Sequence, residues 1–210
     1  MYDIPYFKAG NYDEVFAFMQ AHPFITLCGC DANNNPVATH VPVLIDKRDE
    51  KIFLQAHVMR KQKHTAAFEQ NKNVLAIFSG THTYVSASWY EQNDVASTWN
   101  YQAVHAAGIL HWKDENFLHA LLTKLTEKFE DNTHSPSLVS KMNEAYVSNM
   151  MKAIIAFEIE IISIDHIFKL SQNRNEKSYE NIIEHLQKGN EDARSIAAIM
   201  KERQRKVFPE

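Results

Sequence analysis

Glycine-rich loops, cysteine clusters and long apolar runs are all scarce in this sequence. Its 210 residues include only five glycines, which are spread out and show no GxGxxG or P-loop spacing. Cys28 and Cys30 are the only cysteines, and two thiols cannot by themselves form a four-ligand zinc site. No apolar run reaches the length of a membrane span, and no secretory signal pattern opens the chain. We therefore expect a cytoplasmic protein without a membrane segment, whose cysteines are small buried hydrophobic residues.

Positive charge is also scarce. The sequence carries 22 Lys and Arg residues against 26 Asp and Glu residues, a formal net charge of −4. A dedicated nucleic-acid binder usually carries a basic excess, because phosphate neutralisation dominates its affinity. One local basic run, Lys201–Lys206, stands near the C-terminus, where cations also complement the dipole of a helix end. Any DNA binding by this run is expected to be weak and sensitive to salt.

The eleven histidines are scattered, and no pair shows HExxH or a similar spacing of metal ligands. His105 and His111 would share one face of a strand, yet two ligands do not complete a metal site. The sequence contains no GxSxG motif of a serine hydrolase, and the spacing of its residues indicates no activated acid–base pair. We therefore expect no metal site, and the sequence identifies no catalytic residue.

Hydrophobic periodicity predicts a mainly β protein with α additions (α+β). The expected strands cover residues 24–30, 37–45, 51–57, 74–79, 83–88, 103–112 and 152–164. Short links favour an antiparallel meander for the first three strands, because parallel pairs need long crossovers. A turn is expected at residues 80–82. Helices are expected after Asp13 and Asp114 as N-caps, over 64–69, and from Ser137 onward.

Several short antiparallel strands flanked by helices indicate a small barrel with helical additions. The composition is 45% hydrophobic and 23% charged, close to that of average globular proteins. This composition and the chain length favour a single domain over residues 1–210, with a helical C-terminal extension over about 176–210.

Cations cluster directly after the third expected strand. Arg60, Lys61 and Lys63 follow His57 and precede a short expected helix. An anionic group at this junction would meet the cationic side chains and the amide groups of the helix N-terminus. An ordinary solvated turn carries similar charge runs, so the spacing alone leaves both interpretations open.

Aromatic residues cluster over positions 84–101, which hold two tryptophans and three tyrosines among small hydroxyl residues. Such side chains could stack on a planar ring and hydrogen-bond its edges, or they could close the end of a barrel. A third polar segment, Lys169–Arg174, follows a strand of buried character. This segment could form the rim of a binding site, because loops often hold functional groups. It could equally be an ordinary turn before a helix.

Together these segments resemble a known family, the PaiB-like FMN-binding negative transcriptional regulators. The resemblance rests on Met1–Phe7, Ala38–Pro42, Ser86–Tyr90, Thr98–His105 and Lys169–Arg174. Spaced motifs that follow one another in the family's order are far more specific than any one of them. The resemblance extends from the first residues to about Met200, and the chain is identified as a member on this basis.

The resemblance implies an FMN-binding split β-barrel with flanking helices and a C-terminal helical region, working as a homodimer. The residues implied for cofactor binding are Thr39, His40, His57, Arg60, Lys61, Lys63, Trp99, Asn100, Lys169 and Gln172. In related split barrels, cations after the third strand take the phosphate, a role that falls here on the three cations of this set. The residues of the second and third strands would lie along the isoalloxazine ring. The remaining four would complete the pocket, from the same subunit or from the partner.

The implied function is that of a flavin-binding regulator that senses FMN occupancy or redox state, although the sequence shows no helix-turn-helix. An enzyme is the alternative, because split barrels include flavin oxidoreductases, pyridoxamine-phosphate oxidases and haem-degrading proteins. A flavin- or haem-dependent oxidoreductase would then be expected, with haem the less favoured cofactor.

Overall fold

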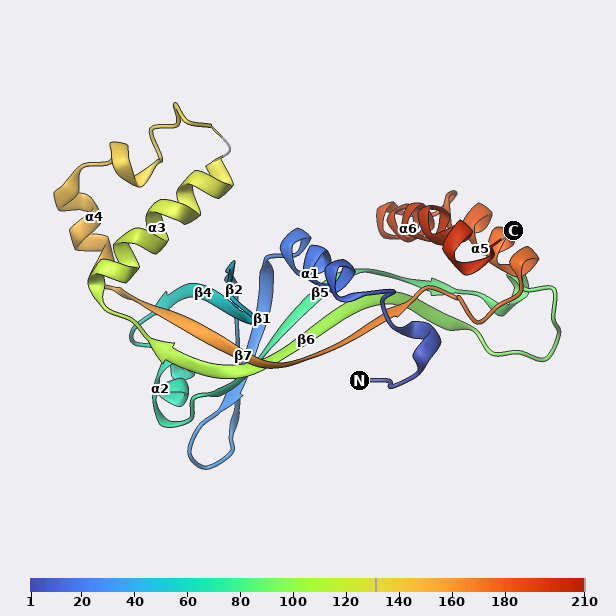
Figure 1. Ribbon diagram of the computed structural model, residues 1–210, viewed down its shortest axis with the longest axis horizontal. Coiled ribbons are helices and arrows are strands. Elements are labelled where there is room, and N and C mark those ends of the chain that lie inside the picture. Colours follow the sequence, from blue (N-terminus) through green and yellow to red (C-terminus); the bar gives the residue numbers. More distant parts are fainter. Residues whose placement is uncertain (131, 210) are drawn as a thin grey trace. The chain divides into compact units, whose positions relative to one another are not determined.

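The computed structural model describes residues 1–130 and 132–209, and the chain divides into two compact units. Unit 1 comprises Met1–Met19, Ser79–Val104 and Asp165–Glu210, and unit 2 comprises Gln20–Phe78 and His105–Ile164. Three long strands supply residues to both units: β5 (Asn73–Val85), β6 (Thr98–Trp112) and β7 (Ile154–Lys169) (Figure 1). The expectation of a single domain over residues 1–210 stays a prediction.

Seven strands form one sheet in the order β2-β1-β5-β6-β7-β4-β3. Besides the three long strands, these are β1 (Phe24–Cys30), β2 (Pro36–Pro42), β3 (Leu44–Arg48) and β4 (Lys51–Met59). β1 pairs antiparallel with β2, from Phe24 opposite Pro42 to Cys30 opposite Pro36. β4 pairs antiparallel with both β3 and β7. The prediction of a mainly β, antiparallel fold with α additions is confirmed.

The predicted second strand, over residues 37–45, is wrong in a way that decides the topology. The chain breaks its pairing at Val43, whose backbone N–H donates to Pro23 O at 2.8 Å. Residues before this break pair with β1 and residues after it pair with β4. β2 and β3 therefore stand at opposite ends of the strand order, and the predicted meander is wrong. Within unit 2, β2 also approaches β4 and lines a pocket with it, as in a sheet that closes into a barrel.

β5 corrects a second prediction, because it runs without a break through residues 80–82, where the sequence indicated a turn. Buried side chains alternate at even-numbered positions from Val74 to Phe78, but the next buried side chain, Val85, is at an odd-numbered position. The alternation therefore changes phase near Gly80, as it does at a β-bulge. In the sequence, such a change of phase resembles two strands joined by a turn.

The helices are α1 (Tyr12–Ala21), α2 (Lys63–Gln70), α3 (Glu115–Glu130), α4 (Glu144–Met151), α5 (Glu176–Leu186) and α6 (Glu191–Val207). Short 3-10 helices cover Pro5–Phe7, Ala87–Trp89 and Val139–Lys141. Asn11 caps α1 by accepting from Glu14 N at 2.9 Å, so the predicted cap at Asp13 is wrong. Asp114 caps α3 as predicted. The predicted C-terminal helical region is confirmed as α5 and α6.

Each unit has its own core. In unit 1, α5 and α6 pack on Tyr90 and Leu170, and the hydroxyl of the fully buried Tyr179 donates to Met200 O at 2.9 Å. In unit 2, the buried leucines of α3 pack on Ala156 of β7. Within the described part of the chain, no helix combines the length and the apolar character that a membrane crossing requires.

Candidate functional site

In unit 2, the strands β2 and β4 and the start of α2 line a pocket of about 250 Å³. Its lining residues are Thr39, His40, Val41, Pro42, His57, Val58, Met59, His64 and Ile154. Thr39 is half-buried, whereas His40 is exposed and stacks on Phe24 with ring centroids 6.1 Å apart. The pocket therefore brings together the three residues that were predicted to lie along the isoalloxazine ring: Thr39, His40 and His57.

His57 carries a polar atom that the fold leaves unpaired. Its Nδ1 is buried and has no hydrogen-bond partner among the described residues. Burial lowers the pKa of His57, and burial also lowers the pKa of His64 on α2. Both imidazoles are therefore neutral near pH 7, where each ring offers one donor and one acceptor nitrogen. A buried ring nitrogen without a partner is a group that a bound molecule can pair.

The predicted phosphate-binding cations stand at the edge of this pocket. Arg60, Lys61 and Lys63 lie between Met59 and His64, which both line it. The backbone N–H of Arg60 donates at 2.9 Å to the carbonyl just before β7, which fixes the start of the turn. All three cationic side chains are exposed, and none forms an ion pair or side-chain hydrogen bond with another residue of the described ranges. They remain available to an anion.

Asn100, in contrast, uses its amide within unit 1. The side chain is fully buried, and its Oδ1 accepts from Ser171 Oγ at 3.0 Å. Its Nδ2 donates to Met200 Sδ at 3.4 Å. Ser171 adopts a left-handed φ of 63°, which few non-glycine residues adopt. The hydrogen bond from Ser171 to Asn100 therefore stabilises a turn that the backbone alone would disfavour.

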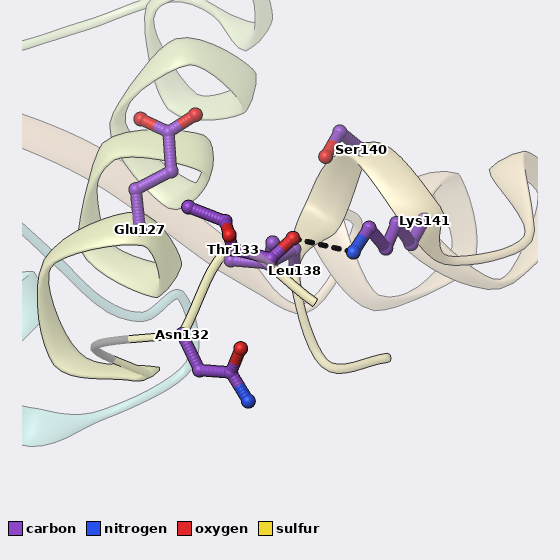
Figure 2. A pocket seen from close by; sticks show the side chains of 6 residues that line it. All are labelled: Glu127, Asn132, Thr133, Leu138, Ser140 and Lys141. Carbon is purple, nitrogen blue, oxygen red and sulfur yellow. Dashed lines mark hydrogen bonds between the residues drawn. The ribbon is translucent and has the colours of Figure 1, made fainter. Parts of the chain in front are cut away.

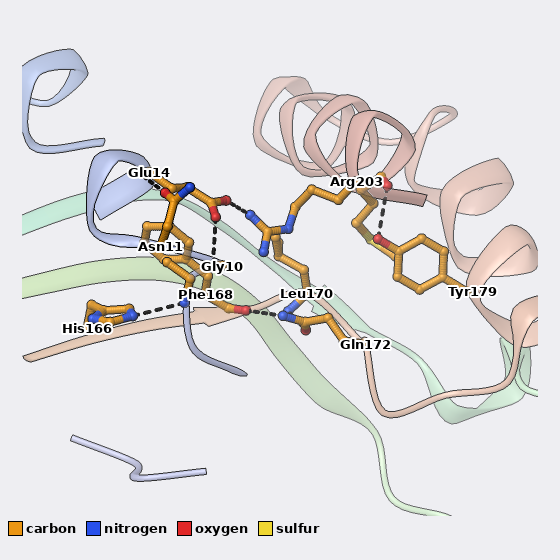
Figure 3. Close-up of polar contacts among 11 residues, drawn as sticks. Gly10, Asn11, Glu14, His166, Phe168, Leu170, Gln172, Tyr179 and Arg203 are labelled. Atoms are coloured by element: carbon orange, nitrogen blue, oxygen red, sulfur yellow. Dashed lines mark hydrogen bonds and ion pairs between the residues drawn. The ribbon is translucent and has the colours of Figure 1, made fainter. Parts of the chain in front are cut away.

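Gln172 also serves its own turn. Its Nε2 donates to Phe168 O, and its Oε1 accepts from Leu170 N at 2.6 Å (Figure 3). Nearby, Arg203 of α6 points to Glu14 of α1 and forms an ion pair with it (Figure 3). These contacts tie the end of β7 and the C-terminal helices into unit 1. The side chain of Gln172 is folded onto its own backbone and is not directed at a ligand.

Lys169 and Trp99 complete the group in unit 1. β7 extends to Lys169, beyond its predicted end at Ile164, and Lys169 Nζ donates to Thr98 Oγ1 and to Trp99 O, the latter at 3.1 Å. Burial, and then the charge of Arg174, lowers the pKa of Lys169. Trp99 differs from the other three members because its side chain is 52% exposed.

The ten predicted residues therefore fall into two groups, one in each unit. Thr39, His40, His57, Arg60, Lys61 and Lys63 belong to unit 2, and Trp99, Asn100, Lys169 and Gln172 belong to unit 1. The expectation that both groups line one FMN pocket stays a prediction.

A buried ion-pair cluster in unit 2 escaped the sequence-based predictions. Glu158 of β7 is 3% exposed and accepts from Lys113 Nζ and from Gln55 Nε2, each at 3.0 Å, and it pairs with Arg48. Burial would raise the pKa of Glu158, but the hydrogen bonds and the charges of Lys113 and Arg48 outweigh it, and the pKa is lowered. An acidic residue inside an apolar strand could have indicated this cluster in the sequence. A carboxylate that is buried in such a strand is almost always paired with a cation. Since its partners are internal, this cluster supports the strands.

Another pocket of unit 2, of about 680 Å³, lies beside the segment that follows α3 (Figure 2). It is lined by Glu127, Asn132, Thr133, Leu138, Ser140 and Lys141. Lys141 Nζ is directed at Thr133 O, to which it donates at 2.5 Å (Figure 2). None of the predicted residues lies in this pocket. Within residues 1–130 and 132–209, no group of three or more His, Cys, Asp or Glu side chains could hold a metal ion.

Solved structures show the class of this fold. Mycobacterium tuberculosis Rv2991 matches with a TM-score of 0.54 and 13% identity, covering 80% of this chain and 90% of that one. The flavocytochrome Anf3 from Azotobacter vinelandii matches with a TM-score of 0.53 and 16% identity, covering 77% of this chain and 68% of that one. At such low identity the likeness concerns the fold alone. The predicted class, a split β-barrel with flanking helices, is confirmed.

Sequence comparison defines the family within this class. Residues 1–163 match the family described as "Putative FMN-binding domain", and the chain belongs to it. A relative in Bacillus subtilis, named protease synthase and sporulation protein PAI 2, is 36% identical over 207 residues, which cover 98% of this chain and 99% of the relative. The resemblance on which the predicted residues rest is therefore confirmed at the level of the family.

Proposed function

We propose that the protein binds FMN at the pocket of unit 2 and acts as a flavin-binding regulatory protein. The proposal rests on polar and charged groups at this pocket that have no hydrogen-bond or ion-pair partner among the described residues. Arg60, Lys61 and Lys63 make no ion pair within the described ranges, and His57 Nδ1 is buried without a partner there. Exposed cations beside a helix start suit a phosphate, and a buried ring nitrogen suits a hydrogen-bonding ligand.

The two ends of FMN would meet different parts of this pocket. Arg60 and Lys63 would hold the phosphate, with Lys61 contributing less, because neighbouring side chains in an extended turn point apart. Thr39, His40 and His57 would lie along the isoalloxazine ring. Bound FMN would supply a redox-active ring, while the residues of the chain bind and orient it.

The size of the pocket favours a shared site. Its volume of about 250 Å³ is below the range of roughly 300–1,000 Å³ that encloses a drug-sized ligand. One chain would therefore enclose only part of FMN, and a second copy would cover the rest. A two-fold dimer would create two equivalent sites on one self-complementary surface. Sedimentation with FMN present tests this part of the proposal, and a monomer at micromolar concentration would contradict it.

The regulatory part of the proposal rests on the resemblance to the regulator family and on the relative, whose name is protease synthase and sporulation protein PAI 2. Flavin occupancy would then be the signal that the protein reports. The same pocket could serve a flavin- or haem-dependent oxidoreductase, since His40, His57 and His64 all line it. Absorption spectra of the purified protein, before and after addition of FMN or haem, separate these cofactors by their flavin and Soret bands.

The decisive experiment compares FMN with riboflavin, which lacks the phosphate. Removing one charged hydrogen-bond partner typically costs about 1.5–3 kcal/mol, or roughly tenfold to more than a hundredfold in affinity. We expect Arg60→Ala and Lys63→Ala each to weaken FMN binding by about that factor and to leave riboflavin binding nearly unchanged. Lys47→Ala, at an exposed position of β3 without an assigned role, is the matched control and should change neither ligand.

Flavin fluorescence titration measures both affinities. Equal losses for FMN and riboflavin would mean that these cations support the ring pocket or the fold. If the unmutated protein binds neither ligand, the flavin proposal falls.

A further inference from the structure

The segment before α1 is fastened to β7 at two adjacent positions within unit 1. We call residues 1–10 the N-terminal strap. Lys8 Nζ donates to Asp165 Oδ1 at 2.8 Å and to His166 O at 3.2 Å. The backbone N–H of Ala9 donates to Nε2 of the His166 ring at 2.9 Å (Figure 3). The strap is therefore held by one ion pair and by one hydrogen bond to an imidazole.

The ion pair does not respond to pH in the range around neutrality. Its hydrogen bond holds the pKa of Asp165 below the usual range and raises the pKa of Lys8. Both groups therefore stay charged between pH 5.5 and pH 7.5. Because the pair is partly exposed, it contributes little to holding the strap closed.

The hydrogen bond from Ala9 to His166 does respond to pH. A ring nitrogen accepts a hydrogen bond only while it carries no proton, and a protonated imidazole has donors alone. Burial, and then the charge of Lys8, lowers the pKa of His166, and these effects outweigh the opposing charge of Asp165. The closed strap thus takes up the proton less readily than an open strap, whose ring has the usual pKa of about 6.5. The closed strap is most favoured above that pH and is disfavoured as the pH falls below it.

The charges beside the His166 ring come from the strap and from β7. Within the described ranges, Lys8 and Asp165 face the ring. Asp3 lies 3.3 Å from Lys8 Nζ, and the amine of Met1 lies 3.8 Å from Asp165. A proton on the ring would add a second positive charge next to Lys8, which further disfavours the closed strap.

The far side of the His166 ring is apolar, and the end of the strap is fixed there. The ring packs against Phe168 with centroids 5.8 Å apart, and the guanidinium of Arg203 lies 5.8 Å from the centroid of Phe168. Arg203 pairs with Glu14, which also accepts from Gly10 N at 2.8 Å. Gly10 therefore stays attached to α1 when the residues before it move.

We propose that the N-terminal strap is an acid-sensitive latch, in which protonation of His166 releases Ala9 and lets the strap lift from β7. Phe7 is the apolar residue that moves with it. Phe7 is only 4% exposed in the closed strap, and its ring centroid lies 5.8 Å from Lys169 Nζ. Opening uncovers both the Phe7 ring and this ammonium group. The inference does not rest on the proposed flavin site.

Amide hydrogen exchange, followed by NMR on the full chain at pH 7.5 and pH 5.5, tests the latch. After division by the intrinsic rate at each pH, exchange at Phe7, Lys8 and Ala9 should be faster at pH 5.5 by up to about tenfold. This is the limit for one proton taken up between a pKa of about 6.5 and pH 5.5. Phe7 and Lys8 should follow Ala9, because the single 3-10 turn at Pro5–Phe7 does not persist alone. Gly10 is the internal control, and its corrected exchange should not change.

His166→Gln removes the titrating ring and keeps an acceptor at a similar reach. This variant should show the same corrected exchange at Phe7, Lys8 and Ala9 at both pH values. His119→Gln is the matched control, because His119 is an exposed histidine of α3 in unit 2, and it should keep the pH dependence of the unmutated protein. In the unmutated protein, the midpoint of the change in exchange should coincide with the titration of the His166 ring, followed by its NMR shifts.

Four results would overturn the inference. The first is equal corrected exchange at both pH values in the unmutated protein, and the second is a pH dependence that survives in His166→Gln. The third is faster exchange at Ala9 alone, which would mean that the hydrogen bond breaks while the strap stays closed. The fourth is an equal increase at Gly10 and in α5 and α6, which would mean that unit 1 unfolds as a whole. If His166→Gln does not fold, a midpoint of exchange that differs from the ring titration overturns the inference.

Discussion

The two groups of residues that the family motifs single out differ in what they contact. In unit 2, Arg60, Lys61 and Lys63 carry charges that no described residue neutralises, and His57 Nδ1 is buried without a partner there. In unit 1, the side chain of Asn100 is hydrogen-bonded to other parts of the same unit. Both groups come from equally distinctive stretches of sequence, yet one is open to a ligand and the other is largely occupied by the fold.

This difference shows that a distinctive polar motif does not by itself mark a binding site. The motif at Lys169–Arg174 follows a strand and is rich in polar side chains, as a site lip would be. Its Gln172 instead closes its own turn, and its Ser171 supports Asn100. A polar group that the fold leaves unpaired is a better indicator of a ligand, because leaving it buried and unpaired costs free energy.

The largest expected effect tests the ligand-directed group. The double variant Arg60→Ala, Lys63→Ala should weaken FMN binding by roughly a hundredfold or more, because two phosphate partners are lost together. Its thermal unfolding midpoint without ligand should match that of the unmutated protein, since both side chains are exposed and unengaged within the described residues. Fluorescence titration and thermal unfolding measure the two quantities. A clear drop in the unfolding midpoint would mean that Arg60 and Lys63 stabilise the fold, as Asn100 does, and are not reserved for a ligand.

The second prediction tests the group that serves the fold. Asn100→Ala should lower the free energy of unfolding by about 1–3 kcal/mol, because it removes a buried side chain that accepts from Ser171 and donates to Met200. FMN affinity of the folded variant should stay the same. Denaturant unfolding measures the loss, and Asn93→Ala, in an exposed loop of unit 1, is the control. Weaker FMN binding with unchanged stability would mean that Asn100 belongs to the FMN-binding site and does not mainly stabilise the fold.

The third prediction compares an unpaired imidazole with a paired one. Burial lowers the pKa of His57, and burial together with the charge of Lys8 lowers the pKa of His166, whose Nε2 accepts from Ala9 N at 2.9 Å. The unfolded chain therefore takes up these protons first. The stability that depends on the neutral rings is present above the usual imidazole pKa of about 6.5 and is lost as the pH falls below it.

Each ring can contribute at most about 1.4 kcal/mol per pH unit to this slope. His57→Asn should reduce the slope and leave stability at pH 8 nearly unchanged, because no described partner is lost. His166→Asn should reduce the slope and also lower stability at pH 8, because Ala9 N loses its acceptor. Unfolding series at pH 8 and pH 5.5 measure both variants. A slope in His57→Asn equal to that of the unmutated protein would contradict this assignment.

The smallest expected effect concerns the C-terminal basic run, which differs from the cations of unit 2 in one respect. Arg203 pairs with Glu14, so Lys201, Arg205 and Lys206 are the cations of this run that remain exposed. DNA binding through them should be weak, with a slope of log affinity against log salt no steeper than about −3, following counterion release. Fluorescence anisotropy with a labelled duplex at several salt concentrations measures the slope. A tight complex indifferent to salt would reveal another DNA-binding surface.

Much of the local structure followed from the sequence. The strand at Phe24–Cys30, the cap at Asp114 and the helices of the C-terminal region were predicted, because each depends on periodicity or on a capping side chain a few residues away. The antiparallel pairing also followed, from the short links between strands. The cluster of cations before α2 was also predicted from neighbouring positions, and in the structure these side chains are exposed.

The break at Val43, the phase change in β5 and the two-unit division were not predictable in this way. At Val43 the pairing switches from β1 to β4, a choice made by strands that meet only in the folded chain. At Gly80 the strand continues through a change of phase that looks like a turn in the sequence. The local pattern is the same for either outcome, so only packing against the rest of the sheet decides between them.

By itself, then, the sequence determined the family, the fold class and the residues that merit attention, because motifs and periodicities are properties of neighbouring positions. Only the tertiary structure decided which of those residues are open to a ligand. Asn100 contacts Ser171, which is 71 positions away along the chain, and Arg203 contacts Glu14, which is 189 positions away. Whether a polar side chain is satisfied depends on partners brought close by folding, and no spacing rule along the chain contains that information.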